Sequence, residues 1–324
     1  MPKNGIGGWL QRIKYARTLV TQLAYWPLLV RELRRADVVH VFSASYFSFV
    51  LSPWPAVRVA RAVGKPIVFN YHSGEAPDHL RRSALARRTL RAADVNVVPS
   101  RFLQEVFAKF RIPALVIPNV VDLDRFAYRD RRTPRPRLVS TRNFEPMYNV
   151  ACTLRAFQLV QRRFPEATLT LVGHGSQQSA LEQLARDLGL QHVTFTGRLA
   201  PERMPQAYDS ADLYVQTPSI DNMPMSVLEA FASGTPVVST DVGGVRAMLT
   251  DRVHGRLVPD NDPQAVANAV IELLDDPVGA VQLARQARAA CDAYTWTATR
   301  DRWLDVYRST LPRAAVAGAT VAAQ

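Results

Sequence analysis

Short apolar runs rich in β-branched residues alternate with segments of helical periodicity along most of the chain. Several runs are apolar without a break, which is typical of parallel strands covered on both faces. Between them, apolar residues recur every three or four positions, as at Leu154, Phe157 and Val160. This alternation predicts βαβ units and a doubly wound α/β fold. The expected strands are 38–42, 67–70, 95–98, 115–117, 138–140, 169–172, 193–195, 213–215 and 236–239.

The chain has 324 residues, which is the length of about two domains. The segment 129–137 is rich in arginine and proline, lacks apolar periodicity, and is the predicted boundary between them. A strand and a glycine-rich turn normally open a nucleotide-binding α/β half, but here a helical stretch precedes the first strand. We therefore expect an incomplete start. The predicted parts are 1–130, 131–296, a terminal helix 297–312 returning toward the first domain, and a disordered tail 313–324.

Composition excludes several classes of protein. Hydrophobic residues make up 48% of the chain and charged residues 21%, which excludes a mostly disordered chain. Two cysteines are too few for a disulfide framework or a cysteine-based zinc site. The start lacks the pattern of a signal peptide, and the longest uncharged stretch, 38–57, contains His40, two prolines and four serines. Phosphate-loop, HExxH and GxSxG motifs are absent.

Charge is distributed unevenly along the chain. Residues 1–132 carry 22 basic and 9 acidic side chains, a net charge of +13, whereas residues 133–324 carry 18 and 19, a net charge of −1. Such asymmetry indicates an anionic partner, which is a membrane surface, a nucleic acid or a phosphorylated acceptor. On a single helix, Arg81, Arg88 and Arg91 would lie near one face with Arg82 and Arg87 beside it.

The segment 217–248 combines two acids with several turn residues. Asp221 follows a predicted strand, and Glu229 stands eight positions later inside a predicted helix whose first residue is near Pro224. A helix N-terminus offers free N–H groups and a positive dipole end to a pyrophosphate. Asp221 is then placed to hold a sugar, and Glu229 to accept ribose hydroxyls. Capping and solvent-exposed roles are the alternatives for the two acids.

This segment resembles the retaining GT-B-fold glycosyltransferases of family 4, which use nucleotide-sugar donors. The family pattern reads here as Pro218-Ser219, Asp221-x7-Glu229, Ala232-x-Gly234-x-Pro236-Val237-Val238 and Gly243-Gly244. Aspartate replaces the first glutamate, and Asn222-Met223-Pro224 replaces Gly-Phe-Gly. Further matches are 171–175, 195–198, 118–126 and 294–307, so the resemblance covers about residues 37 to 310.

The resemblance implies two Rossmann-like domains facing a cleft, and a role for particular residues. His72, Asp221 and Arg142 would form the catalytic centre, although no lysine follows Arg142 where the family has one. A fixed cation there would stabilise the leaving diphosphate, and a neutral His72 would contact the donor sugar. Glu229, Gly173, Gly197, Arg198, Leu199, Asn222, Met223 and Ser226 would bind the donor. Ser73, Gly74 and Glu75 are acceptor-side candidates.

The sequence thus predicts a retaining glycosyltransferase without a covalent catalyst, metal ion or cofactor beyond the nucleotide-sugar co-substrate. Its expected partners are a lipid-linked or glycan acceptor and an anionic membrane, at the inner face of which the protein would be peripheral and cytoplasmic. No nucleic acid is expected. Three alternatives stay open: a non-catalytic truncated relic that binds nucleotide sugar or a partner, a nucleotide-sugar epimerase of the same fold, and a basic nucleic-acid-binding protein.

Overall fold

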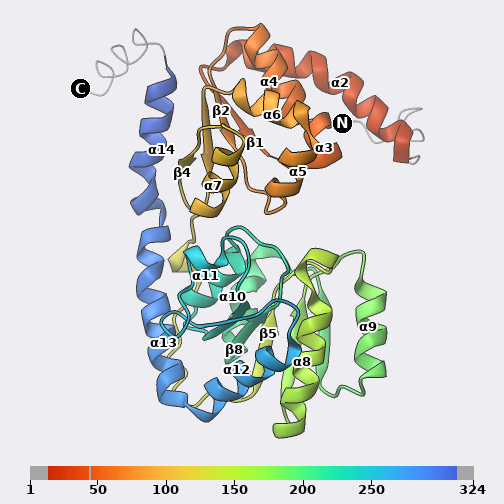
Figure 1. Cartoon of the computed structure of the whole chain (residues 1–324), viewed down its shortest axis with the longest axis vertical. Helices are drawn as coiled ribbons and strands as arrows, with labels where there is room; N and C mark the ends of the chain where they lie inside the picture. Colours follow the sequence, from red (N-terminus) through yellow and green to blue (C-terminus); the bar gives the residue numbers. More distant parts are fainter. Residues whose placement is uncertain (1–13, 44, 312–324) are drawn as a thin grey trace. The chain divides into compact units, whose positions relative to one another are not determined.

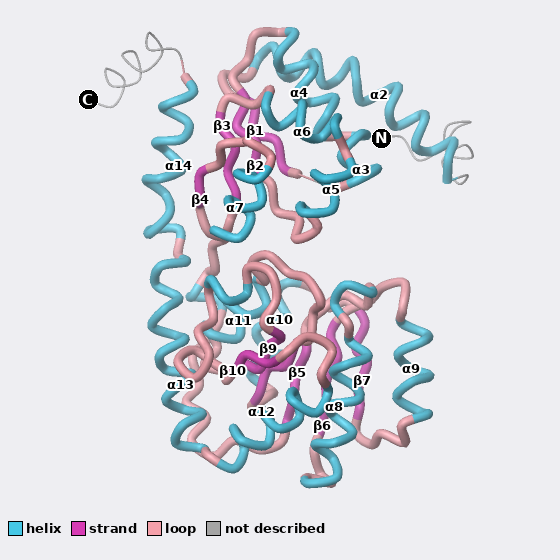
Figure 2. The backbone as a smooth tube through the Cα atoms, in the orientation of Figure 1, coloured by secondary structure: helices cyan, strands magenta, loops and turns pink. Residues whose placement is uncertain are grey.

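A computed structural model describes residues 14–43 and 45–311, with side chains described from residue 21. Contacts divide these residues into two compact units (Figures 1 and 2). The first unit comprises the residues up to Val98, Gln104–Val116 and the residues from Arg302 on, and the second comprises Pro99–Leu103 and Ile117–Asp301. The predicted tail 313–324 lies outside the described residues. The domain limits at residues 130 and 296 stay a prediction.

The described part of the first unit is built on a parallel sheet of strand order β1-β2-β3-β4. Strand β2 is buried along its whole length, as its apolar run predicts. Helix α2 packs on α4 through an edge-on contact of Trp26 with Trp54, whose ring centroids are 6.1 Å apart. The elements up to β4 are α2 (Lys14–Arg35), β1 (Val39–Phe42), α3 (Tyr46–Leu51), α4 (Pro53–Ala62), β2 (Ile67–Asn70), α5 (Ala76–Arg82), α6 (Ala84–Arg91), β3 (Val95–Val98), α7 (Arg101–Lys109) and β4 (Leu115–Val116).

The arginines between residues 81 and 91 do not share one helix, so that prediction was wrong. Helix α5 ends before Ser83, whose hydroxyl begins α6 by accepting a hydrogen bond from the Ala86 N–H at 3.1 Å. The guanidinium of Arg87 turns back to donate to the carbonyl oxygens of Leu80 and Arg81. Arg87 is therefore a structural cation. The exposed cations of this window are Arg81, Arg82, Arg88 and Arg91.

The second unit contains a parallel sheet of order β10-β9-β8-β5-β6-β7 among its described residues. Chain order reverses direction between β5 and β8, which pair directly through Leu138 and Val139. This is the strand order of a doubly wound nucleotide-binding fold. The strands are β5 (Arg137–Ser140), β6 (Thr168–Val172), β7 (Val193–Gly197), β8 (Leu213–Gln216), β9 (Val237–Thr240) and β10 (Arg256–Val258). The helices after β4 are η1 (Leu123–Arg125), η2 (Pro146–Tyr148), α8 (Val150–Arg163), α9 (Gln178–Asp187), η3 (Pro201–Arg203), α10 (Met204–Asp209), α11 (Met225–Ala232), η4 (Val245–Ala247), α12 (Pro263–Asp275), α13 (Pro277–Ala290), η5 (Cys291–Tyr294) and α14 (Trp296–Thr310). The residues of α14 from Arg302 on belong to the first unit.

Apolar residues of the second sheet pack into two separate hydrophobic cores, because successive side chains of a strand point to opposite faces of the sheet. Leu138 and Leu213 join a core with α8, α9 and α12. Val139 and Tyr214, their neighbours in sequence, join a core with α10 and α11. The continuous apolar strands predicted from the sequence are confirmed, and the doubly wound α/β architecture follows from them.

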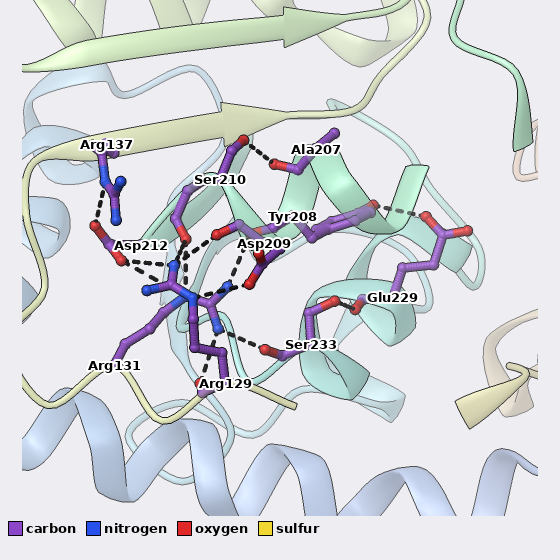
Figure 3. Close-up of polar contacts among 11 residues, drawn as sticks. Arg129, Arg131, Arg137, Ala207, Tyr208, Asp209, Ser210, Asp212, Glu229 and Ser233 are labelled. Atoms are coloured by element: carbon purple, nitrogen blue, oxygen red, sulfur yellow. Dashed lines mark hydrogen bonds and ion pairs between the residues drawn. The ribbon is translucent and has the colours of Figure 1, made fainter. Parts of the chain in front are cut away.

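The arginine-rich segment 129–137 belongs to the second unit, where its arginines bind polar groups of other elements (Figure 3). Arg131 is buried and donates to four carbonyl oxygens, including Tyr208 O at 2.9 Å and Ser233 O at 2.6 Å, at the ends of α10 and α11. Burial lowers its pKa to about 10. Arg129 and Arg137 hold the buried Asp212 at 2.9 and 2.7 Å. A positive charge at two helix C-termini is favourable because the carbonyl ends are partially negative.

Candidate functional site

Arg142 and the loop before α11 flank the point where the second sheet reverses its strand order. Arg142 follows β5, and the residues 217–224 connect the adjacent strand β8 to α11. Ligands of open α/β sheets bind outside the carboxyl ends of the strands at such a switch point. Helix α11 begins at Met225, with Pro224 as its N-cap residue, which confirms the prediction of a helix that starts near Pro224.

The Arg142 guanidinium is held on three sides. It forms an ion pair with Asp221, donates to the Ser226 hydroxyl at 3.0 Å, and lies over the Tyr148 ring at 4.1 Å from its centroid. Burial, the largest single effect, lowers the pKa of Arg142, but Asp221 and the neighbouring Tyr214, Tyr148 and Tyr208 together outweigh it, so the pKa lies above its usual value. The structure thus brings three predicted site residues into direct contact and keeps the cation charged.

Two glycines support the loop that carries Asp221 and Asn222. A Cβ on Gly243 would collide with the Asp221 carbonyl oxygen, and one on Gly244 with the Asn222 carbonyl oxygen. The Gly244 N–H donates to Asp221 O at 3.0 Å. Glycine at these two positions therefore allows the backbone to pass close to the loop that carries Asp221 and Asn222. The Asn119 amide adds a hydrogen bond to the carbonyl of Met223 at 3.0 Å.

Gly173 and Gly197 lie side by side after β6 and at the end of β7. The Gly173 N–H donates to Gly197 O at 3.0 Å, and a Cβ on Gly173 would collide with the backbone carbonyl of Arg142. The predicted donor residues of these turns therefore adjoin the strand end that carries Arg142. Arg198 is exposed and Leu199 is half-buried.

Glu229 is half-buried one turn into α11 and receives a hydrogen bond from the Tyr208 hydroxyl at 2.8 Å (Figure 3). Burial raises the pKa of Glu229, while the Tyr208 hydrogen bond and the charges of Arg125 and Arg142 oppose that shift. A carboxylate in this position accepts hydrogen bonds from hydroxyl groups, which is the property that ribose recognition requires.

The remaining predicted residues belong to the first unit and follow strand β2. His72 is half-buried, and burial lowers its pKa, so its imidazole is neutral at physiological pH. The Ser73 hydroxyl accepts from the Glu75 N–H at 3.2 Å, and Glu75 is the N-cap residue of α5. His40, at the end of β1, shares a hydrogen bond of 2.8 Å with Tyr307 of α14.

Sequence inspection missed Tyr148 and Tyr208. Tyr148 occupies the segment in which the resemblance led us to look for a lysine, and a ring stacked on Arg142 has no spacing signal. Tyr208 and Glu229 are 21 positions apart, separated by a strand and a loop. Their contact depends on the packing of α10 against α11, which periodicity does not specify.

Two parallel α/β units and this site define the class of GT-B glycosyltransferases. Family profiles agree: residues 125–290 match "Glycosyl transferases group 1" and residues 8–125 match "Glycosyltransferase Family 4". The chain belongs to the family 4 glycosyltransferases, as the resemblance predicted. Crystal structures of similar fold include HepE of Anabaena with UDP and glucose (TM-score 0.76, 20% identity, 90% of this chain and 83% of that one). Sucrose-phosphate synthase of Thermosynechococcus elongatus is also similar (TM-score 0.70, 21% identity, 84% and 73%).

Curated relatives include mannosyltransferases of mycobacteria. The phosphatidyl-myo-inositol mannosyltransferase of Mycobacterium tuberculosis H37Rv is 32% identical over 311 residues, covering 90% of this chain and 80% of the relative. The GDP-mannose-dependent alpha-(1-6)-phosphatidylinositol monomannoside mannosyltransferase of Mycolicibacterium smegmatis is 31% identical over 261 residues, covering 73% and 68%. The chain is thus a glycosyltransferase with mannosyltransferase relatives at about 30% identity.

Proposed function

We propose that the chain transfers a sugar from a nucleotide-sugar donor to a membrane-associated lipid or glycan acceptor, with retention of configuration and without a metal ion. The arrangement that carries this proposal is Arg142 at the switch point, in contact with Asp221 and Ser226. A fixed guanidinium recognises a diphosphate and stabilises the charge that develops as it leaves. Glu229 on the following helix would accept hydrogen bonds from the ribose.

In the proposed reaction, the bond between the anomeric carbon and the diphosphate oxygen breaks as the acceptor oxygen bonds to the same face of the sugar. The acceptor proton passes to the departing phosphate oxygen. Asp221 would hold sugar hydroxyls once the diphosphate takes its place on Arg142. The neutral imidazole of His72 would donate to or accept from the transferring sugar. Since retention needs no enzyme nucleophile in this scheme, we assign none.

The relatives supply the first donor and acceptor to test, which are GDP-mannose and phosphatidylinositol. The protein is incubated with phosphatidylinositol in mixed vesicles and with GDP-mannose, GDP-glucose or UDP-glucose. We expect a glycosylated lipid from one donor, with an α-anomeric product by NMR. The matched control is Arg142→Ala, which should lower turnover by about one to three orders of magnitude.

Other outcomes would favour the alternatives. Epimerisation of the donor without an acceptor would identify an epimerase. Thermal stabilisation by nucleotide sugars without transfer to any acceptor of a lipid and glycan panel would indicate a non-catalytic relic. Salt-sensitive DNA binding without donor binding would indicate a nucleic-acid-binding protein.

We also propose a peripheral position on the inner face of the membrane. No helix within residues 14–43 and 45–311 combines the length and apolar character needed to cross a bilayer. The first unit instead exposes apolar side chains together with arginines. Leu23 is 76% exposed on α2 and Phe47 is 69% exposed on α3, and the exposed arginines of α5 and α6 belong to the same unit. Apolar side chains and cations on one unit favour an anionic lipid surface.

A further inference from the structure

The Tyr208 hydroxyl is fixed in space by the burial of its ring. The side chain is fully buried on α10, with the Phe126 ring edge-on at 5.9 Å and the Tyr214 ring at 5.8 Å between centroids. The Arg131 guanidinium binds the backbone carbonyl of Tyr208 at 2.9 Å, as Figure 3 shows. Because ring and backbone are both held, the hydroxyl has little freedom to move.

This hydroxyl contacts two elements that form the proposed donor site. It donates to Glu229 Oε2 at 2.8 Å, since an ionised carboxylate can only accept, and it lies 3.2 Å from Ser226 O. The Thr141 hydroxyl, 2.7 Å away, then donates to the Tyr208 oxygen. Thr141 immediately precedes Arg142. The hydroxyl therefore joins the end of β5 to α11 and links the residues proposed to hold the diphosphate and the ribose.

We propose that Tyr208 is a positioning residue that presents the carboxylate of Glu229 to the ribose of the donor. The inference rests on the proposed function, because it takes Glu229 to be the ribose ligand. With Oε2 held by Tyr208, Glu229 offers Oε1 to a ribose hydroxyl in one orientation. A glutamate without this hydrogen bond would have to lose more rotamer freedom on binding.

The proposed arrangement also predicts how the protonation of Glu229 depends on pH. The charged groups that act on Glu229 are Arg125 from η1 and Arg142 from the end of β5, and Tyr208 from α10 supplies its hydrogen bond. All three lower the pKa of Glu229 against the effect of burial. Removing the Tyr208 hydroxyl should raise the pKa of Glu229 further, so that on acidification the carboxylate becomes protonated at a higher pH.

The test compares Tyr208→Phe with the wild type in calorimetric titrations with GDP, UDP and the corresponding 2′-deoxynucleotides. We expect Tyr208→Phe to bind the preferred ribonucleotide about 5- to 10-fold more weakly, the loss of one hydrogen bond to a charged group. The ratio of its affinities for the ribonucleotide and the deoxynucleotide should be smaller than in the wild type. The pH at which affinity falls on acidification should be higher. The turnover of bound donor should change less than its KM.

Tyr71→Phe is the matched control, because Tyr71 is also fully buried and its hydroxyl contacts His79 at 2.9 Å in the first unit. It should leave nucleotide affinity unchanged. The variant Glu229→Gln measures how much nucleotide affinity is lost when the negative charge of Glu229 is removed. Should Tyr208→Phe fail to fold, Glu229→Asp replaces it: the shorter side chain withdraws the carboxylate from Tyr208 and should likewise reduce ribose preference.

Unchanged affinity in a folded Tyr208→Phe protein overturns the inference, and so does an equal loss for ribo- and deoxynucleotides at every pH, which would show a packing role. In both cases wild-type binding leaves the proposed function standing. If the wild type binds no nucleoside diphosphate, the proposed function itself fails and the inference falls with it.

Discussion

At the scale of single residues, the most informative contact is the ion pair of Arg142 with Asp221. The sequence indicated both residues but assigned them to different parts of the donor. In the structure they neutralise each other, with Asp221 where a ligand's phosphate is proposed to bind. A diphosphate must therefore compete with a carboxylate of this chain for the same guanidinium, and the two assigned roles are coupled.

We predict that Asp221→Asn binds nucleoside diphosphate more tightly and transfers sugar more slowly. An amide no longer neutralises Arg142, so the affinity for GDP or UDP should rise about 3- to 10-fold, consistent with a charge-assisted contact. Turnover should fall because the sugar loses a ligand. Calorimetry measures the first effect and a transfer assay the second.

Asp241→Asn is the control for this prediction. Asp241 pairs with Arg246 at 2.7 Å at the surface of the same unit, and its loss changes the net charge equally. Nucleotide affinity should stay at the wild-type value. Weaker binding by Asp221→Asn would show that the carboxylate supports the site without competing for Arg142.

At the scale of elements, the sequence predicted those strands and helices that a local pattern of apolar residues specifies. Continuous apolar runs specified β2, β8 and β9, because strands covered on both faces tolerate few polar residues. Strand β10 was missed, since it has three residues and begins with an arginine. The break between α5 and α6 at Ser83 was also missed. Leu80 before the break and Leu85 and Leu90 after it are all buried or half-buried, so the apolar pattern continues across it.

For the segment 129–137, the role predicted from the sequence differs from the role that its contacts show. Lack of periodicity suggested a linker, yet Arg131 binds carbonyl oxygens at the ends of two helices. Those partners, Tyr208 and Ser233, lie 77 and 102 positions further along the chain. Polar contacts with main-chain atoms leave no residue pattern, so the role of this segment was not predictable. The helical position of Glu229 was predictable, because the local sequence of α11 specifies it, whereas Asp221 lies in the loop before that helix.

We predict that Arg131→Met destabilises the second unit by roughly 2–4 kcal/mol, since several buried carbonyl oxygens lose their donor. The loss of positive charge from two helix C-termini acts in the same direction. Chemical denaturation followed by circular dichroism measures the change. Arg132→Met is the control, because the Arg132 side chain is 81% exposed and should contribute less than about 0.5 kcal/mol. Equal effects of the two variants would contradict the structural role of Arg131.

At the scale of the whole molecule, the net basic charge and most of the large exposed apolar side chains among the described residues belong to the first unit, whereas the Arg142 site belongs to the second. This division matches the proposed division of labour between acceptor and donor. The contacts of Arg87 remove it from the set of cations available to a membrane. Arg81 and Arg82 both pair with Asp78, yet each side chain is at least 70% exposed.

We predict salt-sensitive binding to anionic vesicles. Each arginine near an anionic leaflet contributes about 1 kcal/mol, so replacing Arg81, Arg82 and Arg88 with glutamine should weaken binding about a hundred-fold in co-sedimentation. Added salt should weaken wild-type binding as well. The control replaces three exposed arginines of the second unit, Arg155, Arg163 and Arg186. Equal binding to neutral vesicles would contradict the proposal and favour a soluble anionic acceptor.

We also predict that the first unit loses stability on acidification. Burial lowers the pKa values of His40, His72 and His79. Between these lowered values and the usual value near 6.5, the unfolded chain binds more protons than the folded one, so stability falls as pH drops below about 6.5. Hydrogen exchange of β1, β2 and α5 at pH 7.5 and 5.5 measures the loss. His79→Asn should make the dependence on pH shallower, and an unchanged dependence would contradict this origin.

Helix α14 has a consequence for how such a gene can recombine. The helix is continuous from Trp296 to Thr310, yet its residues from Arg302 on belong to the first unit, where Tyr307 contacts His40. The first unit is therefore encoded at both ends of the described sequence. A single crossover between two homologues that exchanged only the N-terminal part of the first unit would separate Tyr307 from the β1 residue that it contacts. Exchange of the whole first unit therefore requires two crossovers, the second of them inside a helix.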